Sequence, residues 1–370
     1  MISGQKFLKL RQSPLFLARL PYSQRVKDNS VKTHGAMGEL AILRQIRSRA
    51  VKPFHGLRLG IGDDCALLNA RPGEELAVTT DLSIAGRHFR LDWHPAEAVG
   101  HRALARGLSD LAAMGARPVA AFLSLGLPRE LTVATGRRPA WVQRFLDGLF
   151  ALVEAHKTPL AGGDLAESPV AIADIVLVGA VPSGKALLRS GARPGDLLYV
   201  TGALGGAAAG LASLAELAKP QEPAKTRLQP PPIPKKLESL LAPHLYPQPR
   251  IAQGLWLVRH SLATAAIDLS DGLSTDLAHL CEESGVAAEV DAAALPLYPA
   301  ATQAQALSGG EDYELLFTAA AKARLPRAIA GVQITKIGRI VKSRSGKPAI
   351  TLITPQGREP LEPKGWEHFS

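Results

Sequence analysis

Apolar residues recur every three or four positions in some segments of the chain and form short continuous runs in others. The first pattern predicts helices, and the second predicts buried strands. In the first half, helices are predicted over residues 38–49, from Pro95 to Gly115, and around residues 141–152. Their expected buried faces are Leu40, Leu43 and Ile46, then Leu104, Leu108 and Leu111, then Trp141, Phe145, Leu149 and Leu152.

Strand-like runs lie between these helices. They cover residues 57–61, 76–80, 119–127 and 170–181, and the strand over 76–80 is expected to end at Asp81. The triplet Gly162-Gly163-Asp164 interrupts the pattern before the last of these runs. The first half of the chain is therefore predicted to mix helices and strands.

The second half shows the same mixture. Helices are predicted over residues 205–217, near Arg250, and after Asp271, where Ser270 is the expected N-cap. Strands are predicted at 197–201, 265–267, 315–318, 334–340 and 349–353. Because strands and helices do not alternate strictly, the pattern favours an α+β fold built from sandwiches over a doubly wound sheet.

Turn-forming residues divide the chain. Pro182-Ser183-Gly184 marks a predicted boundary between domains at 37–182 and 183–370. Residues 219–234 contain six prolines and are expected to form an exposed loop. Residues 1–36 lack a clean pattern, and we interpret them as a basic extension that is disordered or results from a start site placed too early.

Charge and cysteine content limit the possible functions. The net charge is +10, but residues 1–36 hold seven Lys and Arg against one acidic residue, so the rest of the chain is only weakly basic. Aromatic residues do not alternate with Lys and Arg, which argues against a nucleic-acid-binding protein. No apolar run is long enough to cross a membrane. Cys65 and Cys281 form no disulfide framework, which fits a cytoplasmic protein.

Aspartates are the main candidates for chemistry. Asp63 and Asp64 follow Gly60-Ile61-Gly62, and two carboxylates held close together repel each other unless solvent or a cation separates them. Further aspartates stand beside small residues at Asp81, Asp110, Asp164, Asp268, Asp271 and Asp312. Magnesium prefers such oxygen ligands, and the scarcity of Cys and His nearby disfavours softer metals. Surface aspartates that cap helices and fill turns are the alternative interpretation.

Phosphate-binding signatures are weak. The chain contains no Walker A motif and no protein-kinase signature set. Thr201-Gly-Ala-Leu-Gly-Gly206 precedes a predicted helix, whose N-terminus could hold a phosphate group. Glycines that allow tight packing explain the same residues equally well.

Seven motifs and the C-terminal ending occur in a fixed order over residues 38–369. They are Gly60-Ile-Gly-Asp-Asp-Cys-Ala-Leu67, Thr79-Thr80-Asp81 with Gly86-Arg87-His88-Phe89, Leu108-Ser-Asp-Leu-Ala-Ala-Met-Gly-Ala-Arg117, Gly162-Gly163-Asp164, Leu188-Arg189-Ser190-Gly191-Ala192 with Pro194-Gly195-Asp196, Ile267-Asp-Leu-Ser-Asp-Gly-Leu-Ser-Thr-Asp-Leu-Ala278, Ser308-Gly-Gly-Glu-Asp-Tyr-Glu-Leu-Leu-Phe-Thr318, and Lys364-Gly365-Trp366-Glu367-His368-Phe369. As an ordered set they resemble the thiamine-monophosphate kinase family of the aminoimidazole-ribonucleotide-synthetase-like ATP-binding superfamily.

The resemblance implies an activity and an assembly. The γ-phosphoryl group of ATP would pass to thiamine phosphate by direct in-line transfer, giving thiamine diphosphate and ADP in thiamine diphosphate biosynthesis. Several Mg²⁺ ions would neutralise the phosphates, and no residue would act as an acid or base. The resemblance also implies two α/β sandwich domains and a homodimer, in which the N-terminal sheets of two copies pair across a two-fold axis into a barrel.

Site residues follow from the same resemblance. The implied metal ligands are Asp63, Asp64, Thr79, Thr80, Asp81, Asp110, Asp164, Asp268 and Asp271. The implied ATP contacts are Gly163, Asp164, Arg189 and Ser270. The implied contacts with thiamine phosphate are His88, Glu311 and Trp366, the last by stacking or a cation–π interaction.

Two departures and two alternatives remain. Gly107 and Leu165 stand where the family usually has Asn and Thr, from which we expect weaker affinity for Mg²⁺ or nucleotide. The first alternative function is another ATP-dependent enzyme of the superfamily. A selenophosphate synthetase would need a reactive Cys in an N-terminal glycine-rich loop, and the hydrogenase-maturation enzyme would end in a cysteine tail. The second alternative is a basic nucleic-acid-binding protein.

Overall fold

Two β-sheets are joined by a buried helix in the computed structural model, which describes residues 37–50, 56–61, 65–219, 230–343 and 349–365. The predicted metal ligands Asp63 and Asp64 and the predicted substrate contact Trp366 lie outside these described residues, as does the N-terminal extension. The other predicted site residues can be placed in the fold.

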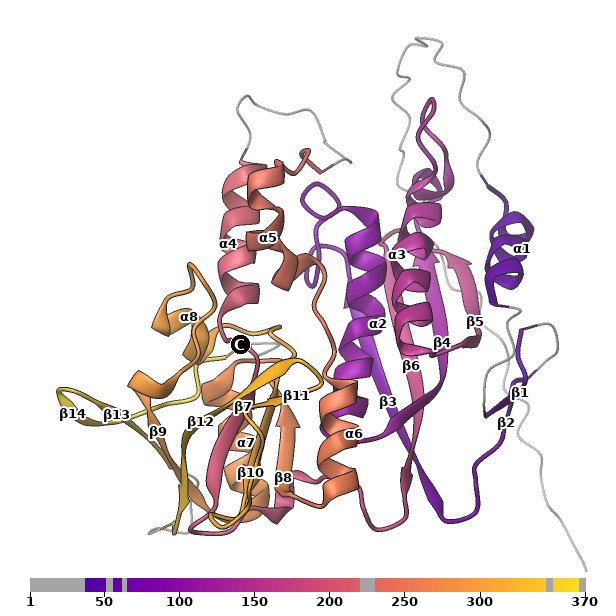
Figure 1. The fold of residues 1–370 in the computed structure, drawn as a ribbon. Helices are drawn as coiled ribbons and strands as arrows, with labels where there is room; N and C mark the ends of the chain where they lie inside the picture. The colour runs from indigo at the N-terminus through magenta and orange to yellow at the C-terminus, as the bar shows by residue number, and fades with distance from the viewer. Residues whose placement is uncertain (1–36, 51–55, 62–64, 220–229, 344–348, 366–370) are drawn as a thin grey trace, which may run out of the picture.

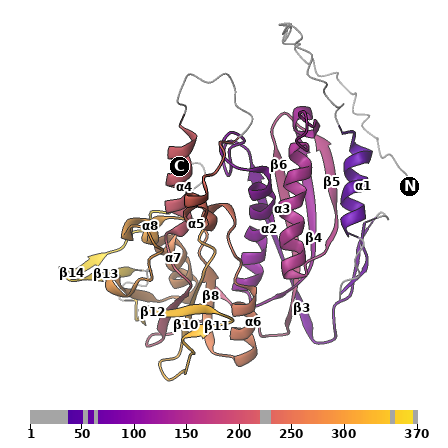
Figure 2. The same cartoon turned by 45° about the horizontal axis from the view of Figure 1, so that its top comes forward.

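The first sheet has four strands in the order β3 (Glu74–Ile84), β6 (Ile172–Pro182), β4 (Arg117–Leu127) and β5 (Leu160–Glu167). β3, β6 and β4 are antiparallel, whereas β4 and β5 are parallel. Helices α2 (Ala96–Ala113) and α3 (Trp141–His156) lie side by side over one face (Figures 1 and 2). Helix α1 (Glu39–Ala50) lies beside β5, and β1 (Leu57–Leu59) and β2 (Leu67–Leu68) form a small hairpin.

The second sheet has eight strands. Its order is β14 (Gly357–Pro360), β13 (Ile350–Thr354), β9 (Ala287–Asp291), β12 (Val332–Val341), β7 (Leu197–Thr201), β10 (Leu315–Ala319) and β8 (Ala263–Asp268), with β11 (Ala328–Ile329) beside β12. Its half of the chain contributes the helices α4 (Gly206–Ala218), α5 (Lys235–Leu245), α6 (Ile251–His260), α7 (Leu273–Ser284) and α8 (Gln303–Ser308). Short 3₁₀ turns occur at Arg129–Thr132, Arg189–Gly191 and Ala292–Ala294.

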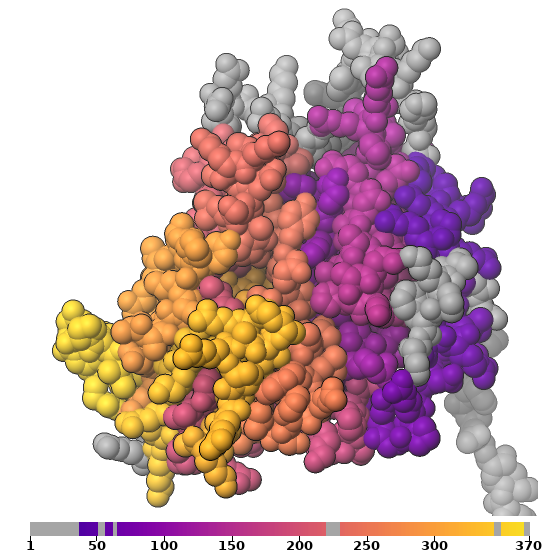
Figure 3. All heavy atoms as spheres, viewed as in Figure 1, coloured from indigo at the N-terminus to yellow at the C-terminus, as the bar shows by residue number. Residues whose placement is uncertain are grey.

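Helix α2 connects the two halves. It packs on the strands of the first sheet and on α3, and it also contacts α5, α6 and β8 of the second half. Leu104, Leu108 and Leu111 are fully buried, as the apolar spacing predicted. Figure 3 shows the resulting contact, in which the orange second half meets the magenta first half along a continuous front.

Glycines let α2 and α3 approach closely. A Cβ atom added at Gly100 would lie 1.9 Å from the Phe145 carbonyl oxygen, and one added at Gly148 would lie 1.8 Å from that of Glu97. Real Cβ atoms do not approach backbone oxygens this closely, so the two helices can pack in this way only with glycine at both positions.

The mixed α/β composition predicted from the sequence is confirmed. The strand over 197–201 is found at its predicted bounds, and the helix beginning after Pro95 ends with Gly115 in a left-handed conformation, at φ +62°. The two sheets are formed by residues 74–182 and 197–360. The domain bounds themselves stay a prediction.

Several local predictions were wrong. Ile46 is buried as predicted, but Leu40 and Leu43 are exposed and Ile42 is buried in their place, because packing on β5 selects that side of the helix. β3 does not end at Asp81 but continues to Ile84, paired with β6 throughout.

The triplet Gly162-Gly163-Asp164 does not break the structure but lies inside β5. A Cβ atom at Gly163 would lie 1.9 Å from the Leu123 carbonyl oxygen. Glycine therefore marks a close approach of two strands here and not a loop.

Helix α5 was missed, and the N-cap of α7 was misassigned. α5 begins directly after Pro234, the last residue of the predicted loop, and tolerates Pro243 in its last turn; residues 220–229 of that loop lie outside the described residues. The N-cap of α7 is Gly272 and not Ser270. The backbone amides of Asp271 and Gly272 donate instead to the carboxylate of Asp276, at 3.1 and 3.0 Å. Among the described helices, none has the length and apolar character needed to cross a membrane.

We expect Gly148→Ala to lower the free energy of unfolding by about 1–3 kcal/mol, because the added methyl group forces α3 away from α2. Urea denaturation followed by circular dichroism measures the change. Gly38→Ala is the matched control, since a Cβ atom there meets nothing within 4 Å. Equal stability of the two variants would contradict the close-packing argument.

Candidate active site

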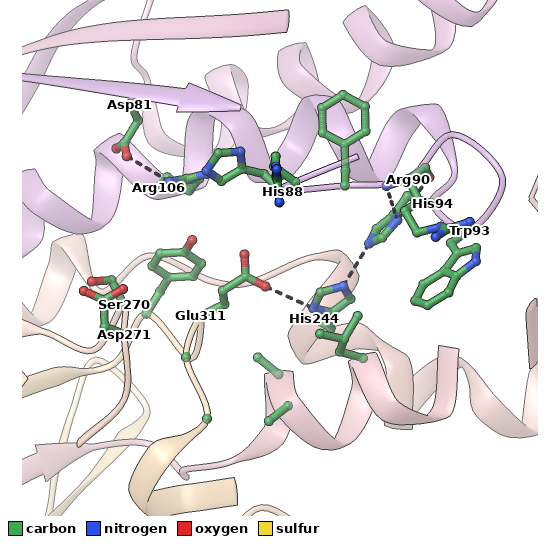
Figure 4. A pocket seen from close by; sticks show the side chains of 18 of the residues that line it. Asp81, His88, Arg90, Trp93, His94, Arg106, His244, Ser270, Asp271 and Glu311 are labelled. Atoms are coloured by element: carbon green, nitrogen blue, oxygen red, sulfur yellow. Dashed lines mark hydrogen bonds and ion pairs between the residues drawn. The ribbon is translucent and has the colours of Figure 1, made fainter. Parts of the chain in front are cut away.

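A cavity of about 600 Å³ lies between the two halves of the chain. Figure 4 shows Asp81, Ser270 and Asp271 at one end, Glu311 near the middle, and His94 and Trp93 at the other end. One end of the cavity is therefore acidic, and the other is lined by histidine and aromatic side chains.

The acidic end draws carboxylates from four elements. Asp81 comes from β3, Asp110 from α2, Asp268 from the end of β8, and Asp271 from the turn before α7. Burial raises the pKa of Asp81 to about 6 against the lowering effect of Arg106, and the charges of Asp110 and Asp174 raise it further. Burial also raises the pKa of Asp268 to about 7, reinforced by Asp110 and Asp81. These carboxylates thus lie near enough to repel one another.

Hydroxyl groups and arginines partly compensate this repulsion. The Thr79 hydroxyl donates to Asp110 Oδ2, and the Ser109 hydroxyl donates to Asp268 Oδ2 at 2.6 Å. Arg106 forms an ion pair with Asp81, with 3.4 Å between Nη2 and Oδ1. The charge of Arg189 lowers the pKa values of Asp110 and Asp268 against the dominant effect of burial.

The described residues do not form a closed metal site. Among them, no three His, Cys, Asp or Glu side chains are arranged to surround a metal ion. Magnesium in phosphoryl-transfer enzymes keeps several waters and binds through one or two carboxylates together with substrate phosphates. The donor set is all oxygen, and a cation would relieve the repulsion that raises these pKa values, so the carboxylates fit Mg²⁺ held jointly with a phosphate.

Two loops, one with Leu269 and Ser270 and the other with residues 311–313, are hydrogen-bonded to each other beside the acidic end. The Glu311 amide donates to the Ser270 carbonyl oxygen at 2.7 Å, and the Tyr313 amide donates to that of Leu269 at 2.8 Å. Glu311 and Tyr313 both adopt left-handed conformations, at φ +68° and +51°. Non-glycine residues adopt such angles only when their surroundings hold them there, and they cluster at functional sites.

Glu311 is held by charged and polar neighbours. Arg102 Nη2 donates to Glu311 Oε1 at 2.5 Å, and His244 Nδ1 lies 3.3 Å from Oε2. Burial by itself raises the pKa of Glu311, but the charge of Arg102 and the hydrogen bond from His244 bring it well below its usual range. The carboxylate is therefore ionised at neutral pH and can only accept hydrogen bonds.

Apolar side chains also line the cavity. They include Phe89, Trp93 and Leu211, and the Arg90 guanidinium lies 4.6 Å from the centre of a Trp93 ring. A flat ring system bound here would meet apolar surface on its faces and Glu311 at its edge.

The structure brings most of the predicted site residues together. Those that line the cavity are Asp81, His88, Asp110, Asp268, Ser270, Asp271 and Glu311. Thr79 joins them through Asp110, and Arg189 acts through its charge. Thr80 points to the opposite face of β3 and is exposed.

Gly163 and Asp164 lie elsewhere. They border a second cavity of about 460 Å³, together with Leu43 of α1 and with Ile61 and Cys65. The Asp164 carboxylate accepts a hydrogen bond from the Leu165 amide at 2.9 Å. The structure thus separates these two residues from the acidic end of the main cavity.

Sequence reasoning missed Arg102, Arg106, His94 and His244. Spacing could have revealed the arginines, because Arg102, Arg106 and Asp110 recur every four residues and so share one face of α2. His94 and His244 are 150 positions apart and carry no local signal.

The structure answers the question left open about the N-terminus of α4. The Asp312 carboxylate accepts hydrogen bonds from the amides of Gly205 and Ala207, at 2.6 and 3.0 Å. The N-terminus of α4 is therefore capped by the protein itself and is not a phosphate cradle.

At Gly107 an added Cβ atom would lie 2.5 Å from Leu177 Cδ1, so the side chain of Leu177 fills the room that an Asn would need.

Comparisons with known proteins identify relatives of this chain. Residues 62–186 match the AIR synthase related protein N-terminal domain, and residues 193–350 match the corresponding C-terminal domain. The chain is 40% identical to thiamine-monophosphate kinase of Escherichia coli (strain K12), over 90% of this chain and 99% of that protein.

Two solved structures are also similar. The crystal structure of thiamine-monophosphate kinase from Stenotrophomonas maltophilia has a TM-score of 0.70 at 38% identity, over 85% of this chain and 97% of that one. A structure described as AaThiL complexed with AMPPCP and TMP has a TM-score of 0.66 at 31% identity, over 90% and 97%.

Fold and site together define an AIR-synthase-related protein. The 40% sequence identity over 90% of the chain identifies the family within this superfamily, because more distant members share the fold at much lower sequence identity. The chain belongs to the thiamine-monophosphate kinase family, as its motifs indicated.

The buried Asp276 gives a prediction about stability. Burial raises its pKa to about 8, reinforced by the charges of Asp268 and Asp271. A carboxyl group whose pKa is higher in the folded than in the unfolded state makes the protein less stable as pH rises between the two values. Asp276→Asn retains an oxygen for the two backbone amides and removes the charge. We expect it to raise the free energy of unfolding at pH 8 by at least about 1 kcal/mol.

Urea denaturation at pH 5 and pH 8 measures this difference. The loss of stability between these two pH values should be smaller in Asp276→Asn than in the unsubstituted protein. Asp291→Asn is the control, because Asp291 also accepts a backbone hydrogen bond, from Ala293, but is exposed. The same loss in all three proteins would show that Asp276 is not the group responsible.

Proposed function

We propose that the protein transfers the γ-phosphoryl group of ATP to thiamine phosphate and releases thiamine diphosphate and ADP. The main supporting observation is one cavity that places the carboxylates of Asp81, Asp110 and Asp268 at one end and the ionised Glu311 beside an apolar wall further along. Such a cavity suits a substrate with phosphate at one end and a cationic, amino-bearing ring system at the other.

Charge is the main obstacle to this reaction. ATP and thiamine phosphate together carry four phosphate groups, and the mutual repulsion of these groups opposes the approach of the two substrates. The acceptor phosphate is already an anionic nucleophile, so the chain needs no general base. The protein's contribution is to position the two substrates and to neutralise their charge. Arg106 and Arg189, both near the carboxylates, supply fixed positive charge on the protein side.

We assign Mg²⁺ to the acidic end of the cavity. When bound there, Mg²⁺ would neutralise phosphate charge and orient the transferred group. Asp81, Asp110, Asp268 and Asp271 would hold it, and the Thr79 hydroxyl orients Asp110. Asp63, Asp64, Thr80 and Asp164 keep their proposed roles as ligands on the family resemblance alone.

The proposed substrate contacts divide along the cavity. Ser270 and Arg189 lie toward the acidic end and would contact ATP. His88 and Glu311 line the cavity further along and would contact thiamine phosphate, with Trp366 as a third contact from the resemblance. Gly163 stays a proposed ATP contact, although it does not border this cavity.

We also propose that the protein is a homodimer and that it acts in the cytoplasm. On the face of the first sheet away from α2 and α3, Leu76, Val78 and Leu82 are between 44% and 63% exposed. An apolar face of this kind, on a strand at the edge of a sheet, is normally covered. A second copy would cover it by pairing sheet with sheet, which is the proposed barrel.

An assay of ADP release tests the proposed activity. We expect turnover with ATP and thiamine phosphate that requires Mg²⁺, and no turnover when thiamine replaces its phosphate. Asp268→Asn should lower kcat about 100-fold, because it removes a carboxylate that we propose holds Mg²⁺ against the phosphates. Asp147→Asn, on the exposed side of α3, is the control and should retain activity. Absence of turnover in the unsubstituted protein would refute the proposal.

Sedimentation equilibrium tests the proposed dimer. We expect Val78→Asp to convert the dimer into a monomer, because the new charge would be buried without a partner. Leu297→Asp is the control, since Leu297 is also exposed but lies in the second half of the chain. A monomeric unsubstituted protein, or a dimer that survives Val78→Asp, would contradict the proposed interface.

A further inference from the structure

Four polar side chains form a continuous chain of contacts at the boundary between the two halves. His94 Nε2 lies 3.0 Å from His244 Nε2, and His244 Nδ1 lies 3.3 Å from Glu311 Oε2. Arg102 Nη2 donates to the other oxygen, Glu311 Oε1, at 2.5 Å. His94 and Arg102 belong to the first half of the chain, and His244 and Glu311 belong to the second.

The four side chains differ in exposure. His94, His244 and Arg102 are each at most 5% exposed, whereas 27% of the Glu311 side chain remains accessible. Figure 4 shows dashed lines that join Glu311 to His244 and His244 to His94. His94, His244 and Glu311 all border the cavity, and Glu311 is the most exposed of the four.

Backbone partners indicate the direction of the hydrogen bonds. The Arg90 carbonyl oxygen already accepts from the amides of Trp93 and His94. The Arg90 amide lies 3.1 Å from His94 Nδ1 and can donate to it, while the Arg90 carbonyl oxygen lies 3.2 Å from the same nitrogen. Because that oxygen already has two donors, we assign the proton of His94 to Nε2, which then donates to His244 Nε2. The proton of a neutral His244 is then on Nδ1, which has Glu311 Oε2 at 3.3 Å as an acceptor and the donor Arg102 Nη1 at 3.0 Å.

Both histidines are neutral in this arrangement. Burial lowers the pKa of His94 to about 3, and burial and the charge of Arg102 lower the pKa of His244. Arg102 Nη1 has its own acceptor in the His244 carbonyl oxygen, at 2.5 Å. Arg102 Nη1 also lies 3.0 Å from Nδ1 and 3.3 Å from Nε2 of His244, so its positive charge opposes protonation of this ring.

We propose that His94 and His244 are positioning residues that, with Arg102, hold the Glu311 carboxylate as a fixed acceptor for the amino group on the pyrimidine ring of thiamine phosphate. This inference rests on the proposed function. Glu311 lies away from the acidic end and, being ionised, only accepts hydrogen bonds, so it suits the donor-bearing part of the substrate. With Oε1 held by Arg102 and Oε2 by His244, the carboxylate can neither rotate nor gain a proton.

The consequence is selectivity. A site built around a fixed acceptor rejects an analogue that lacks the matching donor, because its buried polar group is then left without a partner. The 4-oxo analogue of thiamine phosphate, in which a carbonyl group replaces the amino group, presents an acceptor to an acceptor. The unsubstituted protein should discriminate strongly against it.

Variants of His244 separate a positioning role from a purely structural one. His244→Asn places an N–H group near the position of Nδ1, whereas His244→Leu removes the donor at similar volume. We expect His244→Leu to raise KM for thiamine phosphate about 10- to 100-fold, with KM for ATP changed less than about twofold. Its preference for thiamine phosphate over the 4-oxo analogue should fall by the same factor. His244→Asn should recover most of both properties.

His94 provides a second, independent test. His94→Gln retains an N–H group near the position of Nε2 and should resemble the unsubstituted protein, whereas His94→Leu should reproduce part of the effect of His244→Leu. His156→Leu is the matched control, because His156 is a partly buried histidine at the end of α3 that does not line the cavity. Thermal melting of each variant identifies any that fails to fold.

The outcomes distinguish this inference from the proposed function. If the unsubstituted protein does not turn over thiamine phosphate, the proposed function fails. If it does, but His244→Leu raises KM for ATP as much as KM for thiamine phosphate, or keeps the discrimination against the 4-oxo analogue, the positioning role is wrong. Calorimetric titration with thiamine phosphate in the presence of a non-hydrolysable ATP analogue gives the same comparison without turnover.

Discussion

The burial of α2 between the two halves of the chain is the constraint on which the rest of the structure depends. Fifteen of its eighteen residues are buried, and they include His101, Arg102 and Ser109. Buried polar groups must find partners, and a single helix cannot supply them all. Ser109 donates to Asp268 and Arg102 donates to Glu311, so the partners come from the second half. The need to satisfy these groups fixes the two halves relative to each other and creates the cavity.

The same burial raises the pKa values of the carboxylates in the cavity. Asp81, Asp110 and Asp268 lose solvent and face one another, so their ionised forms are disfavoured without a cation. Because the fold already holds these carboxylates in place, little free energy is needed to orient them when a ligand binds. Perturbed pKa values that cluster in a cleft are typical of functional sites. In this chain the carboxylates with raised pKa values, Asp81, Asp110 and Asp268, all line the cavity.

Much of the fold was predictable from local pattern. The apolar face of α2 and the bounds of β7 follow from spacing alone, and the ordered motifs identified the family together with Asp81, Asp110, Asp268 and Asp271. Choices made by tertiary packing were not predictable. In α1 the residues Leu40, Leu43 and Ile46 fit a helical face as well as Ile42 and Ile46 do, and only the position of β5 selects the second set. The contact of His94 with His244 depends on how two distant segments meet, which no local pattern encodes.

The pairing of β3 with β6 has a consequence for how the protein folds. The eleven pairs of this ladder join residues that are between 88 and 108 positions apart in the chain. Contacts between such distant residues form late, because closing a long loop costs entropy before any pairing stabilises it. During synthesis β3 leaves the ribosome long before its partner and has no other strand of the described sheet to pair with. The first sheet therefore cannot close until nearly half of the chain has been made, and until then β3 is an open strand that another chain could pair with.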